Sequence, residues 1–160
     1  MDSAGDWVYV TLNSSQTTQP LNTASAFSNS LASPIGATTK KLQVALFDFT
    51  YHLAPAVNEG TYLVFCDVVI PAQVVGGELT SLLRTVHCAS AATPTSSSNR
   101  GTYEPNNLQW IDAAGTGGGL NFITTVVYNA EPDPMPPHDW VQTTDLIGTT
   151  LITLAFRVID

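Results

Sequence analysis

The chain contains several short runs in which apolar and polar residues alternate, the period-two pattern of half-buried β-strands. The first run, residues 7–13, places Val8, Val10 and Leu12 on one face. The last run, residues 149–159, alternates in the same way, and its inner face is expected to consist of Ile152, Leu154, Phe156 and Val158. Further strands are predicted at residues 40–53, 61–70, 79–88, 103–112 and 120–129. Seven or eight short strands without a long helix predict an all-β fold, a single jelly-roll β-sandwich of about eight antiparallel strands.

The longest predicted strand, residues 40–53, changes phase in its middle. Apolar residues occupy even positions from Leu42 to Leu46 and odd positions from Phe47 to Tyr51. A shift by one residue moves side chains to the other face of a strand. The pattern therefore predicts a bulge, or a bend between two sheets.

Residues 22–35 (NTASAFSNSLASPI) are too weak for a long helix and too apolar for a free linker. Phe27 and Leu31 are four residues apart, so one or two helical turns would direct both toward the core. Thr23 is a candidate cap for such a segment, and Pro34 would help to end it. The alternative is an ordered loop that buries the same two core plugs.

Turns and loops are predicted between the strands. Residues 71–77 are expected to turn, and the strand at 79–88 is expected to begin as a short helical turn within GELTSLLR. Three longer segments are candidates for interfaces or outer surface: residues 89–101, 113–119 and 130–145.

Length and composition narrow the range of partners. The chain has 160 residues, which suggests one domain spanning 1–160. Only 11% of residues are charged and the net charge is -8, so the positive surface that a nucleic-acid binder needs is not expected. No apolar run reaches the ~18 residues of a membrane span, and no signal peptide is recognised at the N-terminus.

Candidate chemistry is sparse. Cys66 and Cys88 lie in apolar runs and are expected to be buried free thiols. Together with Asp67 and His87 they form the first candidate set of metal ligands. His87 and Cys88 are adjacent, however, and adjacent residues of a strand face opposite sides. No metal is therefore predicted at this set.

The proline-rich loop EPDPMPPHDW contains a second group of polar residues, Glu131, Asp133, His138 and Asp139. It lacks the spacing of a calcium loop, so contact with a partner is the preferred interpretation. Its candidate interface residues are Pro134, Pro137, His138 and Trp140. The glycine-rich segment 115–119 lacks the Lys-Ser/Thr of a phosphate-binding loop. No catalytic residue, cofactor or enzymatic activity is predicted.

The order of several motifs resembles that of a known family. These motifs are, in sequence order, VTLNSSQTTQPLNTASAF, a following PI, VALFDFTYHL, CDVV, GGELTSLLRTV, a Tyr103–Pro105 strand start and TLITLAFR. Together they resemble the single jelly-roll penton, or vertex, proteins of DNA viruses and virus-like transposons that have double jelly-roll major capsid proteins. Virophages and polintons are the closest in character. The resemblance covers nearly the whole chain, from about Val8 to Arg157.

The resemblance implies a structural virion protein that forms homopentamers at the icosahedral five-fold vertices and contacts the major capsid protein. It implies a location at the capsid vertex, after assembly inside the infected host cell. Phe27 and Leu31 would close one edge of the sandwich, and the lack of a large insertion implies a minimal penton. Two alternatives remain: a carbohydrate- or receptor-binding module that stacks sugars on Trp7, Trp110 or Trp140, and a different minor capsid or cement subunit.

Overall fold

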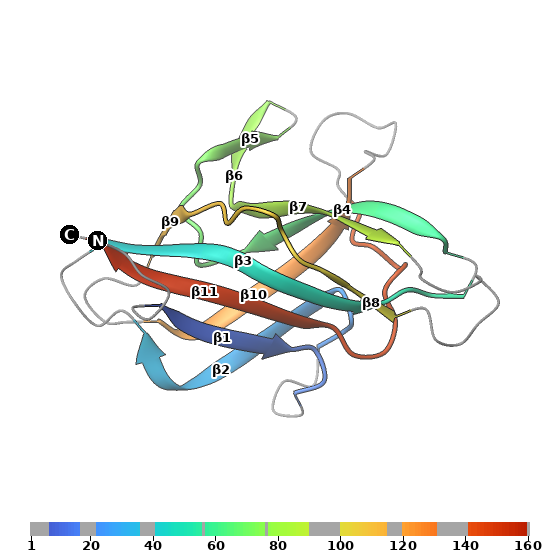
Figure 1. Ribbon diagram of the computed structural model, residues 1–160, viewed down its shortest axis with the longest axis horizontal. Helices are drawn as coiled ribbons and strands as arrows, with labels where there is room; N and C mark the ends of the chain where they lie inside the picture. Colours follow the sequence, from blue (N-terminus) through green and yellow to red (C-terminus); the bar gives the residue numbers. More distant parts are fainter. Residues whose placement is uncertain are drawn as a thin grey trace.

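The chain folds into antiparallel β-structure in the computed structural model (Figure 1). The structure describes residues 7–16, 22–35, 41–55, 57–75, 77–89, 100–114, 120–130 and 141–159. Its strands are β1 (Val8–Asn13), β2 (Ala26–Ile35), β3 (Lys41–His52), β4 (Glu59–Cys66), β5 (Gln73–Val75), β6 (Glu78–Thr80), β7 (Leu82–Ala89), β8 (Arg100–Tyr103), β9 (Ile111–Ala113), β10 (Leu120–Asn129) and β11 (Leu151–Ile159). The described residues contain no helix, and so none that could span a membrane. The predicted all-β class is confirmed.

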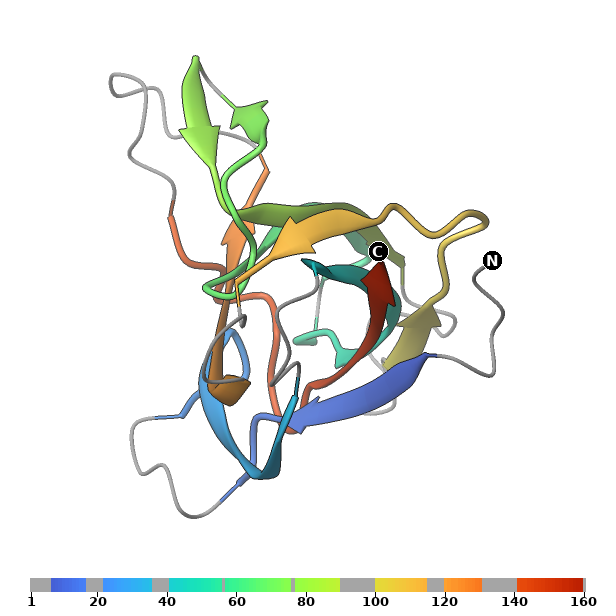
Figure 2. The ribbon, with the colours of Figure 1, turned by 90° about the vertical axis from the view of Figure 1, so that its left-hand side faces the viewer.

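Two sheets form the body of the molecule. The first has the order β1-β11-β3-β8, with β9 also paired to β3, and the second has the order β2-β10-β4-β7. A separate two-stranded hairpin consists of β5 and β6. Figure 2 shows the hairpin projecting from the upper side of the sandwich, whereas β1 and β2 form the lower side.

The pairing of strands is nested along the chain. β1 pairs with β11, β2 with β10, β3 with β8 and β9, and β4 with β7. A jelly roll is an antiparallel double-sheet fold of eight strands, and the nested order is compatible with that prediction. The strands number eleven among the described residues, against about eight predicted. The difference arises because β5 and β6 form the hairpin, and because β8 and β9 pair with successive stretches of β3.

The core lies between the sheets and follows the alternation of the strands. In β11, Ile152, Leu154 and Phe156 are buried as predicted, whereas Val158 at the end of the strand is exposed. In β1, Leu12 is buried, Val10 packs partly against the core, and Val8 is exposed. Val8 begins β1 and Val158 lies near the end of the antiparallel β11, so both exposed valines lie at the same end of the first sheet.

The phase change within β3 is a β-bulge. Thr153 of β11 pairs with Asp48 and Leu154 pairs with Leu46, so Phe47 has no partner in this register. The predicted bulge is confirmed. After it, Phe49 faces the same core as Leu46, and it is 0% exposed. The sequence grouping of Phe47 with Phe49 is wrong, because the ring of the unpaired residue lies outside the core and is 38% exposed.

Residues 26–35 form a strand, and the predicted helical turn in this segment is wrong. Phe27 is buried, and Leu31 packs partly buried against the core. A spacing of four residues places side chains on one face of a helix and equally on one face of a strand, so it could not separate the two. Thr23 does not cap a helix: its backbone bridges Ala26 in the turn before β2.

Two other predicted elements are corrected. The segment GELTSLLR contains β6 and the start of β7 in place of a helical turn, and the predicted turn at 71–77 contains β5. The strand predicted at residues 103–112 is mostly a connection, because β8 ends at Tyr103 and β9 begins at Ile111. This connection brings Trp110, directly before the buried Ile111, into contact with Trp7 and Arg157.

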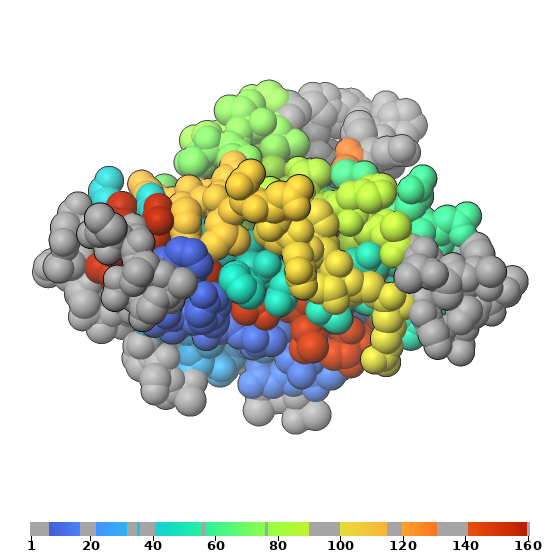
Figure 3. Space-filling model, viewed as in Figure 1, coloured from blue at the N-terminus to red at the C-terminus, as the bar shows by residue number. Residues whose placement is uncertain are grey.

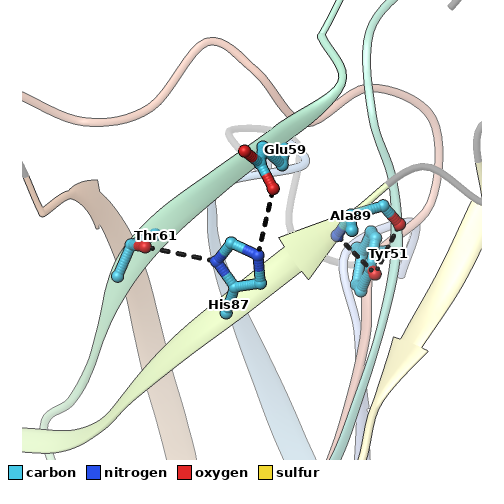
Figure 4. A network of polar contacts seen from close by, with 5 residues as sticks. All are labelled: Tyr51, Glu59, Thr61, His87 and Ala89. Atoms are coloured by element: carbon cyan, nitrogen blue, oxygen red, sulfur yellow. Dashed lines mark hydrogen bonds and ion pairs between the residues drawn. The ribbon is translucent and has the colours of Figure 1, made fainter.

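Hydrogen bonds join the two sheets on both sides of the sandwich. On the side of the edge strands β1 and β2, the side-chain oxygen of Asn29 in β2 accepts the backbone N–H of Asn13 in β1 at 2.8 Å, and its amide donates to the Asn13 carbonyl at 3.1 Å. On the side of β7, the Tyr51 hydroxyl of β3 donates to the carbonyl of Ala89 in β7 and accepts the N–H of the same residue, each at 3.0 Å. Figure 4 shows this second contact.

Candidate interaction surfaces

Aromatic side chains gather on the outer face of the first sheet. The outer aromatic surface consists of Trp7, Tyr9, Phe47 and Trp110, with Arg157 beside them. The rings of Tyr9 and Phe47 lie 4.9 Å apart and those of Trp7 and Trp110 lie 5.1 Å apart, both edge to face. Figure 3 shows the atoms of β1 in dark blue beside those of β3 in cyan and of the β8–β9 connection in yellow. Exposed aromatic clusters of this kind are typical of interfaces.

Polar side chains orient Arg157 within this surface. Its Nε donates to Gln43 Oε1 at 3.0 Å, and the Gln43 amide donates to Asp112 Oδ1 at 3.1 Å. The guanidinium carbon lies 4.2 Å from the ring centre of Trp110, a cation–π contact. Lys41 adds a second cation, 3.9 Å from Asp112 Oδ2, in an exposed pair that contributes little to stability.

The contact between Arg157 and Trp110 weakens the alternative of a module that stacks sugars on its tryptophans. A sugar ring needs a free aromatic face, and Arg157 covers one face of Trp110. Trp7 approaches Trp110 at an interplanar angle of 66°, so the two indoles do not form one flat platform. Trp140, the third tryptophan of that alternative, lies outside the described residues.

The β5–β6 hairpin presents a second apolar surface. Val74 and Leu79 are directly opposite each other in the register, and they are 65% and 61% exposed. The base of the hairpin is held by Gln73, whose amide donates to the Leu82 carbonyl at 2.9 Å, and by Thr80, whose hydroxyl donates to the Gln73 carbonyl at 2.9 Å. A two-stranded hairpin is at best marginally stable by itself, so these two hydrogen bonds are needed to stabilise it.

Sequence reasoning missed this hairpin although a signal was present. Val75 pairs with Glu78, which leaves Gly76 and Gly77 as the two intervening residues. Gly77 has a φ of 87°, a value that favours glycine. A Gly-Gly pair between two short apolar runs is a hairpin signal.

The first candidate metal set does not converge on one point. Cys66 and Cys88 are free and buried, as predicted, whereas His87 points outward from β7. Figure 4 shows the His87 ring between Glu59 and Thr61, with Nε2 3.5 Å from Glu59 Oε2 and Nδ1 3.3 Å from Thr61 Oγ1. Within the described residues, no three His, Cys, Asp or Glu side chains gather where they could hold a metal ion.

Both thiols should be inert in the folded protein. Burial raises the pKa of Cys66 and that of Cys88 to about 12, from an ordinary value of 9.0. The thiolate is the form of cysteine that reacts with such reagents. At pH 8 the raised pKa makes the thiolate fraction about a thousandfold smaller than that of an ordinary thiol. We expect no labelling of the folded chain by a thiol reagent at pH 8, and two labels per chain in denaturant. A Val141→Cys variant, with its exposed position, is the matched control that should react while folded. Rapid labelling of either native thiol in the folded chain would contradict the assigned burial.

The predicted interface loop at residues 130–145 lies mostly outside the described residues. Pro134, Pro137, His138 and Trp140 lie outside the described residues, as do Glu131, Asp133 and Asp139. The same holds for residues 90–99 and 115–119 within the other two predicted loops.

No model of a known protein family matches this sequence, and a search of curated proteins gives no match either.

Proposed function

We propose that the protein is a structural virion protein: a penton subunit that forms homopentamers at the five-fold vertices of an icosahedral capsid and contacts the major capsid protein. Its sandwich would be a single jelly roll, and its location the capsid vertex, after assembly inside the infected host cell. Neither an enzymatic activity nor a cofactor is part of the proposal.

The observation that carries the proposal is the nested strand order. Strands from the start and end of the chain pair with each other, and so do successively inner pairs, in one five-stranded and one four-stranded sheet. This order is compatible with the jelly roll implied by the resemblance of the sequence to penton proteins. Fold alone does not determine function, so the surfaces must also suit a subunit that is enclosed by neighbours.

The surfaces of the molecule support association. Tyr9 and Phe47 are exposed on the outer face of the first sheet, and Val74 and Leu79 are exposed on the hairpin. Exposed apolar groups that lie together mark interaction sites, and a ring subunit buries such groups against the next copy. The low proportion of charged residues, 11%, agrees with a chain that hides much of its surface.

The native mass of the purified chain tests this proposal directly. We expect light scattering after gel filtration to give five times the 17.0 kDa monomer, and negative-stain images to show five-fold rings. A closed ring of five copies repeats one interface five times, so the mass should change little on moderate dilution.

Other masses would support other functions. A trimer would contradict the penton ring and favour a different minor capsid or cement subunit. A monomer that binds defined sugars on a glycan array would favour the carbohydrate-binding module.

A further inference from the structure

We infer that three polar side chains close the edge strands of this sandwich to strand addition, so that copies of the chain do not join edge to edge. These side chains are Asn29 at β1, Asn22 at β2 and Tyr51 at β7. The inference goes beyond the proposed function and does not rest on it, because it concerns growth beyond the native species, whatever the native mass.

The edge strands of this chain need such protection. β1, β2 and β7 each lie at the end of a sheet, and an edge strand presents backbone N–H and C=O groups that can pair with a strand of another copy. Charged side chains commonly prevent this pairing, but β1 (VYVTLN) and β2 (AFSNSLASPI) contain none. Val8 and Tyr9 are exposed, which makes β1 an apolar edge as well.

At β1 the backbone of Asn13 is bonded by the side chain of Asn29. Figure 2 shows β1 and β2 close together on the lower side of the sandwich, and Asn29 reaches from β2 to β1 there. Its Oδ1 accepts the Asn13 N–H at 2.8 Å, and its amide donates to the Asn13 carbonyl at 3.1 Å. One side chain thus makes both hydrogen bonds that a residue of an added antiparallel strand would make.

At β2 the backbone of Ser28 is bonded in the same way by Asn22. The Asn22 Oδ1 accepts the Ser28 N–H at 2.9 Å, and its amide donates to the Ser28 carbonyl at 3.0 Å. Two residues earlier on the same edge, the Thr23 N–H donates to the Ala26 carbonyl at 2.8 Å and the Thr23 Oγ1 accepts the Ala26 N–H at 3.1 Å. Pro34, near the end of β2, has no N–H to offer.

At β7 the Tyr51 hydroxyl makes both bonds to Ala89, as Figure 4 shows. Ala89 is exposed and Ser28 is only partly buried, so water could satisfy the backbone groups of either residue. Side-chain partners are therefore not required there merely to satisfy buried groups. They have a further consequence that water does not have, because a bonded side chain must be displaced before a strand can pair.

Three variants test the inference. Asn22→Ala, Asn29→Ala and Tyr51→Phe each free the N–H and C=O of one edge residue. Sedimentation velocity over a concentration series would measure the species that form beyond the native mass. We expect each variant to form larger species at about tenfold lower concentration than the wild-type chain, because one donor and one acceptor become available for strand pairing.

Hydrogen exchange identifies the surface through which the variants associate. In the native species of each variant, the amide that has lost its partner should exchange quickly: Ser28 for Asn22→Ala, Asn13 for Asn29→Ala and Ala89 for Tyr51→Phe. In the larger species the same amide should become protected again, because it then bonds a strand of another copy. Larger species in which that amide stays unprotected would overturn edge pairing.

Tyr62→Phe is the matched control for Tyr51→Phe. Tyr62 is also buried, but it belongs to the inner strand β4, and its hydroxyl donates to Asp145 Oδ2 at 2.8 Å. All proteins should be compared at the same interval below their own unfolding midpoints, so that lower stability alone does not cause a difference. Tyr62→Phe should then behave as the wild-type chain does. Asn22→Asp, which can accept from Ser28 but cannot donate to it, should lie between the wild-type chain and Asn22→Ala.

Every outcome decides for or against the inference. Equal growth of larger species in Tyr62→Phe would show that destabilisation, and not an opened edge, causes the association. Edge variants that stay folded and grow no more than the wild-type chain would overturn the protective role. The proposed function fails separately: a wild-type chain that is no pentamer contradicts the penton ring and leaves the closed edges standing.

Discussion

Replacing Phe49 by alanine is expected to lower the free energy of unfolding by about 3–5 kcal/mol, the usual cost of removing a fully buried phenylalanine ring. The side chain is 0% exposed, and it lies in the core directly after the bulge of β3. Its ring is tilted against that of Tyr51 with centres 5.8 Å apart, so the cavity would open beside another aromatic group. Denaturant unfolding with a global fit of the midpoint and slope would measure the loss.

Phe47→Ala is the matched control for this prediction. Phe47 is two residues away in the same strand, but its ring is 38% exposed and contacts Tyr9 outside the core. We expect a loss below about 1.5 kcal/mol from that edge-to-face contact and the partly buried area. Similar losses for the two variants would contradict the position of the bulge, because only the bulge makes neighbouring odd-numbered aromatics differ in burial.

The second large effect is expected at Gly101 of β8. This residue pairs with Tyr51 of β3, and a methyl group on it would lie 2.5 Å from the Tyr51 hydroxyl oxygen and 2.7 Å from Cζ. The tyrosine ring cannot move away cheaply, because it is buried and its hydroxyl makes two hydrogen bonds to Ala89. Gly101→Ala should therefore destabilise the fold by about 1–3 kcal/mol through overpacking.

A double-mutant cycle isolates the cause. In a Tyr51→Leu background the ring is absent, so Gly101→Ala should cost little, and the coupling energy should approach the whole cost of the single Gly101 change. Thermal and denaturant unfolding of the four proteins would supply the cycle. If Gly101→Ala costs the same in both backgrounds, its effect arises from the backbone of β8 and the close approach to Tyr51 is not its reason.

In β2 the apolar positions follow from the sequence, whereas the secondary structure does not. Phe27 and Leu31 were recognised as apolar anchors, and both contact the core, although the secondary structure assigned to them was wrong. Their spacing of four residues fits the period of a helix and also that of a strand. The small polar residues between them have only a weak preference for either secondary structure. The segment forms a strand because it pairs with β10, which lies far away in the sequence.

Candidate surfaces were harder to predict than the core. The sequence identified Trp7 and Trp110 as separate sugar-stacking candidates, and it did not show that they form one cluster with Tyr9 and Phe47. These four side chains meet only because β1, β11 and β3 lie side by side in one sheet, and because the connection before β9 returns to β3. No periodicity within one segment contains that information.

The alternation of apolar and polar residues by itself determined the all-β class, most strand positions and the bulge in β3, since burial on one face of a strand leaves a period of two in the sequence. Composition by itself determined the acidic, sparsely charged character of the chain. Only the tertiary structure decided that residues 26–35 form a strand, that Phe47 is exposed while Phe49 is buried, and that the Val74–Leu79 hairpin projects from the sandwich. The physical reason is that the strand at residues 26–35 and the different burial of Phe47 and Phe49 depend on pairing with the distant strands β10 and β11. The energies of such pairing and packing exceed the local preferences that a short window of sequence records.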